Sequence, residues 1–171
     1  NNEIQGVTVL DEELFLVTEK HSQQVDVYRE SRDQRYELTR HIEVAEMKGP
    51  QSLVSSHRHC CLYISDWSAK VVHRIDVASG SCSKWSVGGE PSGLSVTRDD
   101  NNVLVTLCEE KRLEEYTTNG QLVREIRLDE SIDWAWHSVQ LTTGEFVVCH
   151  GRQHSRQQRV CVVNERGEIV K

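Results

Sequence analysis

The sequence predicts an all-β chain built from a repeated four-stranded unit, and three observations support this prediction. The apolar residues fall in short runs with polar turns on either side, and no stretch repeats them at helical spacing over the length of a helix. Valine is the commonest apolar residue, which favours strands over helices. The same order of opening strand, turn and apolar run recurs along the whole chain.

The first strand of each unit carries a small residue near its start. These residues are Gly6, Ser52, Gly93 and Ser138, which gives a unit of about 41–46 residues. Two of the openings are preceded by the only prolines of the chain, Pro50 and Pro91. Proline fixes the backbone there, at a point where a sheet needs no N–H donor.

Three further strands follow each opening. The second strands are predicted at Leu14–Val17, Leu62–Ile64, Val103–Val105 and Phe146–Val148. The third are predicted at Val25–Tyr28, Val72–Ile75, Leu113–Tyr116 and Val160–Val163. Fourth strands are clearest at Cys82–Val87 and Leu122–Leu128, and we expect the chain to stop inside the fourth strand of its last unit.

Four strands in a unit of about 40–45 residues are typical of the blade of a β-propeller. Each blade buries its faces against the next, so the blades are expected to fold together as one domain. We therefore predict a single, partial propeller over residues 1–171. Its blades are expected at residues 4–48, 49–89, 90–134 and 135–171.

The second unit resembles an NHL repeat. The resemblance rests on Gly49-Pro50-Gln51-Ser52-Leu53, on Leu62 to Asp66, and on Val72 to Asp76. The third unit matches through Pro91-Ser92-Gly93-Leu94 and Tyr116 to Gly120. Three positions depart from the family pattern, because Leu107 stands where the family has Asp, Glu19 replaces that Asp in the first unit, and Trp136 replaces the opening Pro in the fourth.

The resemblance implies a six-bladed ring, of which this chain would supply four blades. Two other arrangements stay open, namely a compact four-bladed ring and two copies that complete each other. An open arc would expose two blade faces, so self-association is expected if the propeller is incomplete.

The charge balance limits the classes of partner. The chain has 20 basic and 27 acidic residues and a net charge of −7. This balance argues against bulk electrostatic binding to nucleic acid or to acidic lipid, although a local basic patch remains open. No apolar run approaches the roughly 20 residues of a membrane span, so no membrane partner is expected.

The six cysteines are interpreted as reduced thiols of a cytoplasmic protein, because none has Cys-x-x-Cys spacing and several lie in apolar runs. A zinc site could draw on four residues that are close in sequence, His57, His59, Cys60 and Cys61. Strand alternation would place their side chains on two faces, which argues against such a site. Glu19 and Asp66 are candidate channel carboxylates, but Asp66 is expected to cap the next turn. We therefore expect no metal and no cofactor.

Recognition in such propellers uses the face built by the loops between second and third strands and by the links between blades. Aromatic and basic residues gather there, and Trp and Arg dominate interaction hot spots. The candidate binding residues are Trp67, Lys70, Trp134, Trp136, His137, His150, Arg152, His154 and Arg156.

No catalytic constellation stands out, so the sequence favours a non-enzymatic interaction or scaffold module with a protein partner. The resemblance implies the substrate-recruiting end of a larger protein, as in the tripartite-motif ubiquitin ligases. One alternative is single-stranded RNA binding through the same face, by stacking on Trp and neutralisation by Arg. Another is a metal-dependent hydrolase or lyase of the six-bladed type.

Overall fold

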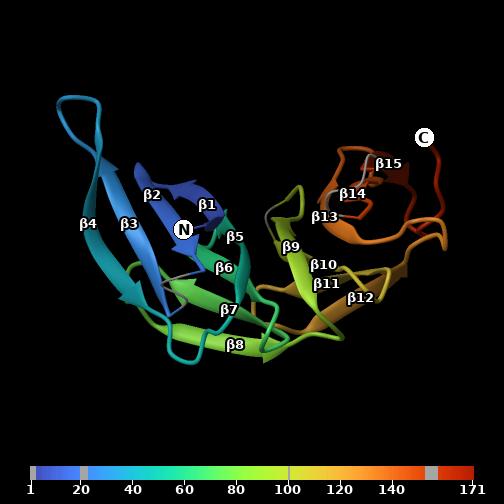
Figure 1. Cartoon of the computed structure of the whole chain (residues 1–171), viewed down its shortest axis with the longest axis horizontal. Helices are drawn as coiled ribbons and strands as arrows, with labels where there is room; N and C mark the ends of the chain where they lie inside the picture. Colours follow the sequence, from blue (N-terminus) through green and yellow to red (C-terminus); the bar gives the residue numbers. More distant parts are fainter. Residues whose placement is uncertain (1–2, 20–22, 100, 153–157) are drawn as a thin grey trace. The chain divides into compact units, whose positions relative to one another are not determined.

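The computed structural model describes residues 3–19, 23–99, 101–152 and 158–171, and within these ranges it contains strands and no helix (Figure 1). The strands form four antiparallel sheets, three of four strands and one of three. This is the predicted all-β propeller architecture, with one sheet for each blade. The described part of the chain has no helix long and apolar enough to span a membrane.

The strands of each sheet follow chain order, so each blade is a simple meander. Blade 1 contains β1 (Ile4–Leu10), β2 (Glu13–Thr18), β3 (Gln24–Glu30) and β4 (Tyr36–Glu43); blade 2 contains β5 (Pro50–Ser56), β6 (Cys61–Asp66), β7 (Val71–Asp76) and β8 (Cys82–Ser86). Blade 3 contains β9 (Pro91–Val96), β10 (Asn102–Leu107), β11 (Arg112–Thr117) and β12 (Leu122–Arg127); blade 4 contains β13 (Ala135–Gln140), β14 (Phe146–His150) and β15 (Arg159–Val163).

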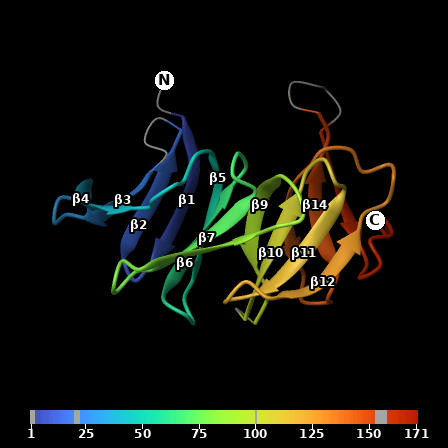
Figure 2. The same ribbon diagram turned by 90° about the horizontal axis from the view of Figure 1, so that it is seen from below.

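Blade 4 has only a trace of its expected fourth strand. An isolated antiparallel bridge joins Val163 to Ile169, beside the outer strand β15. The chain divides into two compact units, Asn1–Trp85 and Ser86–Lys171, which we describe separately. Unit 1 contains blades 1 and 2, and unit 2 contains blades 3 and 4, each drawn as strand meanders in Figure 2.

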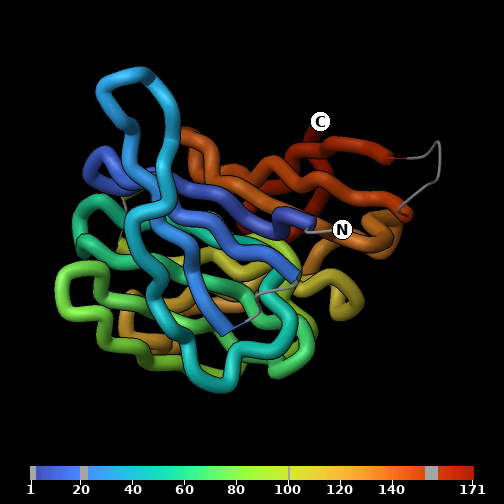
Figure 3. Tube along the Cα trace, turned by 60° about the vertical axis from the view of Figure 1, so that its left-hand side comes forward, coloured from blue at the N-terminus to red at the C-terminus, as the bar shows by residue number. Residues whose placement is uncertain are grey.

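The core of unit 1 lies between its two blades. Alternate residues of blade 1 point to the same side, and Phe15 and Val17 of β2 are fully buried in a cluster with Ile64 of blade 2. Gly6 explains why the opening strand needs a small residue, because a Cβ there would lie 2.7 Å from the Cβ of Leu53. In blade 1 the β3–β4 hairpin extends past the rest of its sheet (Figure 3).

The core of unit 2 has the same construction. Leu104 and Leu113 of blade 3 pack in one buried cluster with Phe146 and Val148 of blade 4. The blades are also joined by hydrogen bonds, since the Oγ1 of Thr106 and the Oγ of Ser138 lie 2.7 Å apart. The Arg124 guanidinium lies over the Phe146 ring, 5.6 Å from its centroid.

The strand registers correct the predicted alignment of blades 1 and 4 by one residue. Pro50 pairs with Asp66 and Pro91 with Leu107, whereas Ala135 pairs with His150. Ala135, not Trp136, therefore stands at the position of the opening proline, and His137, not Ser138, stands at the position of Ser52. In blade 1 the partner of Ile4 is Thr18, so Thr18 and not Glu19 occupies the position of Asp66.

All four blades share a bulge after the first residue of the opening strand. The register shifts between Ile4 and Gly6, between Pro50 and Ser52, and between Ala135 and His137. Such an extra residue leaves no sign in the spacing of apolar positions. Leu107 pairs with Pro91 as Asp66 pairs with Pro50. The predicted equivalence of Leu107 and Asp66 is therefore confirmed.

Candidate functional site

In each blade, the loop after the second strand meets the link that enters the first strand. The backbone N–H of Trp67 donates to the carbonyl of Gly49 at 2.9 Å in unit 1. In unit 2 the N–H of Gly151 donates to the carbonyl of Asp133 at 2.8 Å. We call this end of each blade its rim. The predicted grouping of these loops and links is therefore present within each blade.

Asp66 organises the rim of blade 2. Its carboxylate is fully buried and accepts hydrogen bonds from the N–H groups of Lys48 at 2.8 Å, Gly49 at 3.1 Å and Ala69 at 2.9 Å. Burial alone would raise the pKa of Asp66, but these donors and His73 hold it below its usual value. Asp66 thus caps the β6–β7 turn as expected and also fixes the link from blade 1.

Trp67 and Lys70 lie in the turn that Asp66 caps. Trp67 is half-buried, while Lys70 is exposed and has a positive φ of 55°. Both residues belong to the rim of unit 1, as predicted. Glu19, the other proposed channel carboxylate, is exposed, and its N–H donates to the carbonyl of Glu3. Glu19 and Asp66 therefore occupy different places in their blades.

In blade 3, Glu114 has the role that Asp66 has in blade 2, although it stands at a different position. Leu107 provides no acceptor there, and the carboxylate comes instead from the neighbouring strand β11. Glu114 is 1% exposed and accepts hydrogen bonds from the N–H of Gly88 at 3.0 Å and from the hydroxyl of Tyr116 at 2.6 Å. Arg112 lies 2.7 Å from its other oxygen. The carboxylate that binds the incoming link is therefore on the second strand in blade 2 and on the third strand in blade 3.

Trp134 and Trp136 form the aromatic centre of the blade 4 rim. Their ring centroids lie 5.9 Å apart with an angle of 25° between the planes, so the two indoles stack on each other. The indole N–H of Trp136 donates to the carbonyl of Gly151 at 2.7 Å. Trp134 has a φ of 56°, a conformation that bulky residues rarely adopt. Backbone strain of this kind is frequent at binding sites.

An acidic groove lies on the Trp134 side of this pair. It has a volume of about 180 Å³ and is lined by Cys108, Glu109, Lys111, Asp133 and Trp134. Lys111 places its Nζ 2.8 Å from Asp133, and this ion pair lowers the pKa of Asp133 and raises that of Lys111. We call these five residues the Trp134 groove.

The lining of the Trp134 groove carries more negative than positive charge, because Glu109 and Asp133 face one cation, Lys111. Burial, followed by the charges of Glu109, Glu110 and Glu90, raises the pKa of the Cys108 thiol to about 12. The one cation that lines the groove, Lys111, is already paired with Asp133. An apolar group with a positive charge therefore fits this groove better than an anion does.

A second groove lies on the Trp136 side and has a different character. It has a volume of about 370 Å³ and is lined by Trp136, Cys149, His150, Gln158, Arg159 and Val160. Burial lowers the pKa of His150, and the charge of Arg159 lowers it further. Mixed apolar and positive lining distinguishes this groove from the Trp134 groove.

Unit 2 brings together Trp134, Trp136, His150 and Arg152 of the predicted site. Arg152 is exposed and close enough to Asp133 to lower the pKa of that carboxyl. His137 lies elsewhere, on β13, where it would meet a Cβ placed on Gly93. Burial lowers the pKa of His137, so it is a packing residue between blades. The predicted residues His154 and Arg156 lie outside the described residues.

Several rim residues were not among the predicted ones, although a sequence signal for them exists. Glu109 and Lys111 lie in the loop after β10, and Asp133 in the link before β13. These are the same two kinds of segment that supplied the predicted residues. The predicted binding residues are Trp, His, Arg and Lys side chains, and the acids that surround them in the groove are not among them.

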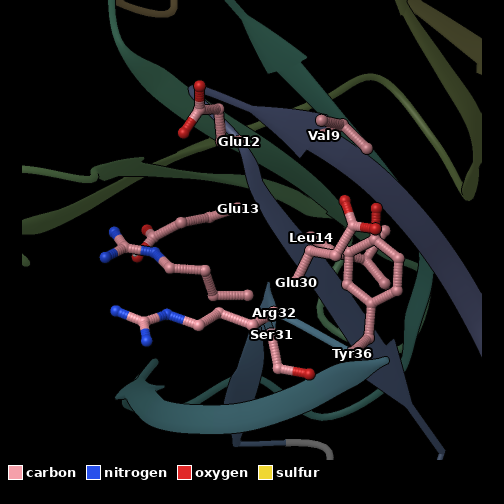
Figure 4. Close-up of a pocket in the computed structure, with 9 residues that line it drawn as sticks. Val9, Glu12, Glu13, Leu14, Glu30, Ser31, Arg32 and Tyr36 are labelled. Carbon is pink, nitrogen blue, oxygen red and sulfur yellow. The ribbon is translucent and has the colours of Figure 1, made fainter. Parts of the chain in front are cut away.

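A larger pocket lies in blade 1, at the opposite end of its strands from the rim (Figure 4). It has a volume of about 520 Å³, and Val9, Glu13, Leu14, Arg29 and Tyr36 are among its lining residues. Glu13 bridges two arginines, at 3.0 Å from Arg29 and 2.9 Å from Arg40. No candidate residue from the sequence lies in this pocket.

The cysteines and histidines of blade 2 do not form a ligand cluster. All six cysteines are free thiols, and Cys60 and Cys61 lie in different environments as predicted. The reason differs from the predicted strand alternation, because Cys60 is exposed in the turn before β6, with a φ of 47°, while Cys61 is the buried first residue of that strand. Within the described ranges, no group of three or more His, Cys, Asp or Glu side chains is placed to hold a metal ion.

Comparison with known proteins supports the fold. No family model matches the chain, and no curated protein matches it. Among solved structures, hydrazine synthase of Kuenenia stuttgartiensis is similar over 98% of this chain and 48% of its own, with a TM-score of 0.79 and 18% identity. Virginiamycin B lyase of Staphylococcus aureus is similar over 99% and 55%, with a TM-score of 0.72 and 14% identity.

A streptogramin B lyase is also similar, over 99% of this chain and 54% of its own, with a TM-score of 0.74 and 11% identity. At these identities the likeness shows the fold alone. The chain spans about half the length of each of these structures. It is thus a β-propeller chain of four blades.

Proposed function

We propose that this chain is a non-enzymatic protein-binding module and that the Trp134 groove is its contact surface. The fold supports this proposal, because each blade presents its loops at one end of a rigid sheet. The NHL type is part of the proposal and rests on the repeat pattern around Pro50, Asp66 and Pro91. The recruitment of substrates for a larger protein is the role we propose for such a module.

The observation that carries the proposal is a strained, half-buried Trp134 beside a negatively charged groove. Tryptophan supplies a large contact area, and the fixed stack with Trp136 means that little side-chain freedom remains to be lost on binding. The acidic residues of the lining favour a partner with a positive charge. We therefore propose a protein segment in which an apolar side chain adjoins Lys or Arg.

A pull-down with quantitative mass spectrometry tests this function. The immobilised wild-type chain is compared with Trp134→Ala and with Glu109→Lys, which reverses a groove charge at an exposed residue. The matched control is Glu37→Lys, the same charge change on the exposed strand β4. We expect both groove variants to lose partners that the control retains. Equal recovery of all partners by the four proteins would refute the assignment of this surface.

Single-stranded RNA binding is the second candidate, and the stacked tryptophans with Arg152 and Arg159 nearby favour it. The acidic residues of the Trp134 groove oppose it, because phosphate contacts need a positive surface. Titration with labelled oligouridylate at low salt separates the two candidates. Binding that weakens steeply with salt would support RNA, and no binding at low salt would exclude it.

The lyase alternative rests on the fold likeness to virginiamycin B lyase and streptogramin B lyase. That likeness, at 11–18% identity across the three structures, supports a shared scaffold and no shared chemistry. The stacked tryptophans beside the acidic groove are the reason that we propose a protein-binding surface.

A further inference from the structure

A pocket at the rim of blade 2 has basic side chains that the function proposed above does not use. It lies where the link from blade 1 meets the turn after β6, and its volume is about 620 Å³. All its lining residues belong to unit 1. We call it the Lys48 pocket, and it is lined by Gln23, Glu46, Lys48, Ser68, Ala69, Val71 and Lys84.

The lining of the Lys48 pocket carries more positive than negative charge. Among its seven residues, Lys48 and Lys84 face one acid, Glu46, which forms an ion pair with Lys84. This contact, followed by the charge of Lys48, lowers the pKa of Glu46, so both ammonium groups act on the same carboxylate. Among the described residues, no carboxylate forms an ion pair with Lys48. An anion that enters the pocket therefore meets two cations that share one acid.

Neutral donors complete the Lys48 pocket. Ser68 carries an exposed hydroxyl, and Gln23 an exposed side-chain amide. The turn that contains Ser68 is fixed, because the N–H of Ala69 donates to the buried carboxylate of Asp66 at 2.9 Å. Ser68 also packs against the link, where a Cβ on Gly49 would collide with its Oγ. The donors of the pocket therefore stand on a turn and a link that are held against each other.

The charge of the rim changes sign between blades 2 and 3. Asp66 and Leu107 stand at the same position of these blades, so Ser68 and Glu109, two residues further on, do as well. Glu109 lines the acidic Trp134 groove, whereas Ser68 lies among lysines. The basic lining is thus a property of blade 2 and does not follow from the shared fold of the blades.

A phosphate monoester matches this pocket better than a carboxylate or a phosphodiester does. Its three terminal oxygens accept hydrogen bonds from several directions, whereas a carboxylate is planar. Its charge of about −1.5 to −2 at pH 7 exceeds that of Glu46, with which it competes for Lys84. Glu46 is 74% exposed, so its ion pair with Lys84 is of the weak surface kind. A phosphodiester strand needs a basic track along several nucleotides, which two lysines do not supply.

We propose that the Lys48 pocket binds the phosphate group of a phosphorylated serine or threonine in a protein partner. The ammonium groups of Lys48 and Lys84 bind the phosphate oxygens, and the hydroxyl of Ser68 donates to one of them. Lys84 leaves Glu46 in this complex, so Glu46 opposes binding. The pocket belongs to unit 1 and the Trp134 groove to unit 2, so the two proposals stand or fall separately.

An NMR titration of the ¹⁵N-labelled chain tests the proposal with one short serine peptide, added with and without a phosphate on its serine. The phosphopeptide is expected to shift the amide signals of Ser68 and Ala69 until they saturate, and the unmodified peptide to leave them in place. Lys48→Ala and Lys84→Ala are each expected to raise the dissociation constant by about threefold to tenfold, because each removes one charge-assisted contact. Glu46→Gln is expected to lower it, because the competing carboxylate is gone.

The control is Lys171→Ala, the same change at an exposed lysine outside the pocket, which is expected to bind like the wild type. Trp134→Ala is also expected to bind the phosphopeptide like the wild type, which separates this site from the groove. The spectra check the folding of each variant, and Lys48→Gln and Lys84→Gln replace any that unfolds.

Four results would overturn the proposal. The phosphopeptide shifts no signal at the pocket, or the unmodified peptide binds equally well. The lysine variants bind like the wild type, or Glu46→Gln weakens binding. Oligouridylate that binds this pocket more tightly than the phosphopeptide would also overturn it, because the site would then recognise a nucleic acid.

Discussion

The Nε2 atom of His73 lies 3.3 Å from Oδ2 of Asp66, and the two residues are 2% and 0% exposed. Burial lowers the pKa of His73, so the ring is neutral and Nε2–H donates to the carboxylate. In blade 3 the corresponding positions hold Glu114 and Leu107. Asp66 and Glu114 are thus buried carboxylates on different strands of their blades, and each accepts hydrogen bonds from the link that enters its blade.

Asp66→Asn is predicted to destabilise the chain by about 2–4 kcal/mol, because the buried carboxylate accepts several hydrogen bonds that an amide cannot all replace. Urea unfolding followed by circular dichroism measures the loss. Asp76→Asn is the control, since Asp76 caps an exposed turn through Ser79 and should lose much less. Equal losses would mean that Asp66 is an ordinary turn cap.

Leu107 and Glu114 stand at the positions of Asp66 and His73, so substitutions at these two positions are predicted to be coupled in their effect on stability. Leu107→Asp alone puts two buried carboxylates side by side and should cost about 3–5 kcal/mol. Adding Glu114→His recreates the Asp–His pair of blade 2, so the two changes should couple favourably by about 1–3 kcal/mol. A double-mutant cycle in urea gives this coupling energy. A value near zero would show that the positions are not equivalent.

Stability is predicted to fall as the pH is lowered from 7 to 5. Burial lowers the pKa of His73, His137 and His150, so the unfolded chain binds protons first, below about pH 6.5. Their contribution is complete above that pH and is lost as the pH falls through the lowered values. Asp66 has a lowered pKa as well, but its contribution is lost only at more acidic pH.

Urea midpoints at pH 7.5 and 5.5 measure this pH dependence. His73→Gln removes one titrating group and should flatten the change, by up to about 1.4 kcal/mol per pH unit. His57→Gln is the control, because His57 is exposed in a turn. A pH dependence that is the same in both variants would contradict the role of burial at His73.

Gly6→Ala is predicted to cost about 1–3 kcal/mol, because its Cβ would lie 2.7 Å from both the Cβ and the backbone nitrogen of Leu53. Thermal unfolding measures the loss. Ser52→Ala tests the same position of blade 2, where a side chain is already accommodated, and should change stability by less than about 1 kcal/mol. A tolerated alanine at position 6 would mean that blades 1 and 2 pack less closely than described.

The repeat pattern predicted the strands and the blade order well because strand alternation and small opening residues are local signals. The first strands predicted around Gly6, Ser52 and Gly93 match β1, β5 and β9. The alignment of blade 4 was wrong because the position of the small opening residue holds His137 there, and the neighbouring Ser138 was matched to Ser52 instead. This one-residue error misplaced Trp136 and Ser138.

The sequence predicted which loops and links form the candidate site, but it did not predict that the groove beside Trp134 is acidic. Trp134 and Trp136 were identified as an aromatic pair, and the structure stacks them. The groove is lined by Glu109, and Glu90 acts on the adjacent Cys108; both acids are distant from Trp134 in sequence and approach it only when the loops of the blades fold. Charge counts along the chain do not show which charges share a surface.

The central claim is that the Trp134 groove selects an apolar group with a positive charge. Fluorescence anisotropy tests it with two labelled peptides of equal length and equal Phe content, one with lysines and one with glutamates, together with oligouridylate. At low salt we predict that the lysine peptide binds most tightly and that Glu109→Lys or Trp134→Ala abolishes this preference while Glu37→Lys keeps it. Tighter binding of the glutamate peptide or of oligouridylate to the wild type would contradict the claim.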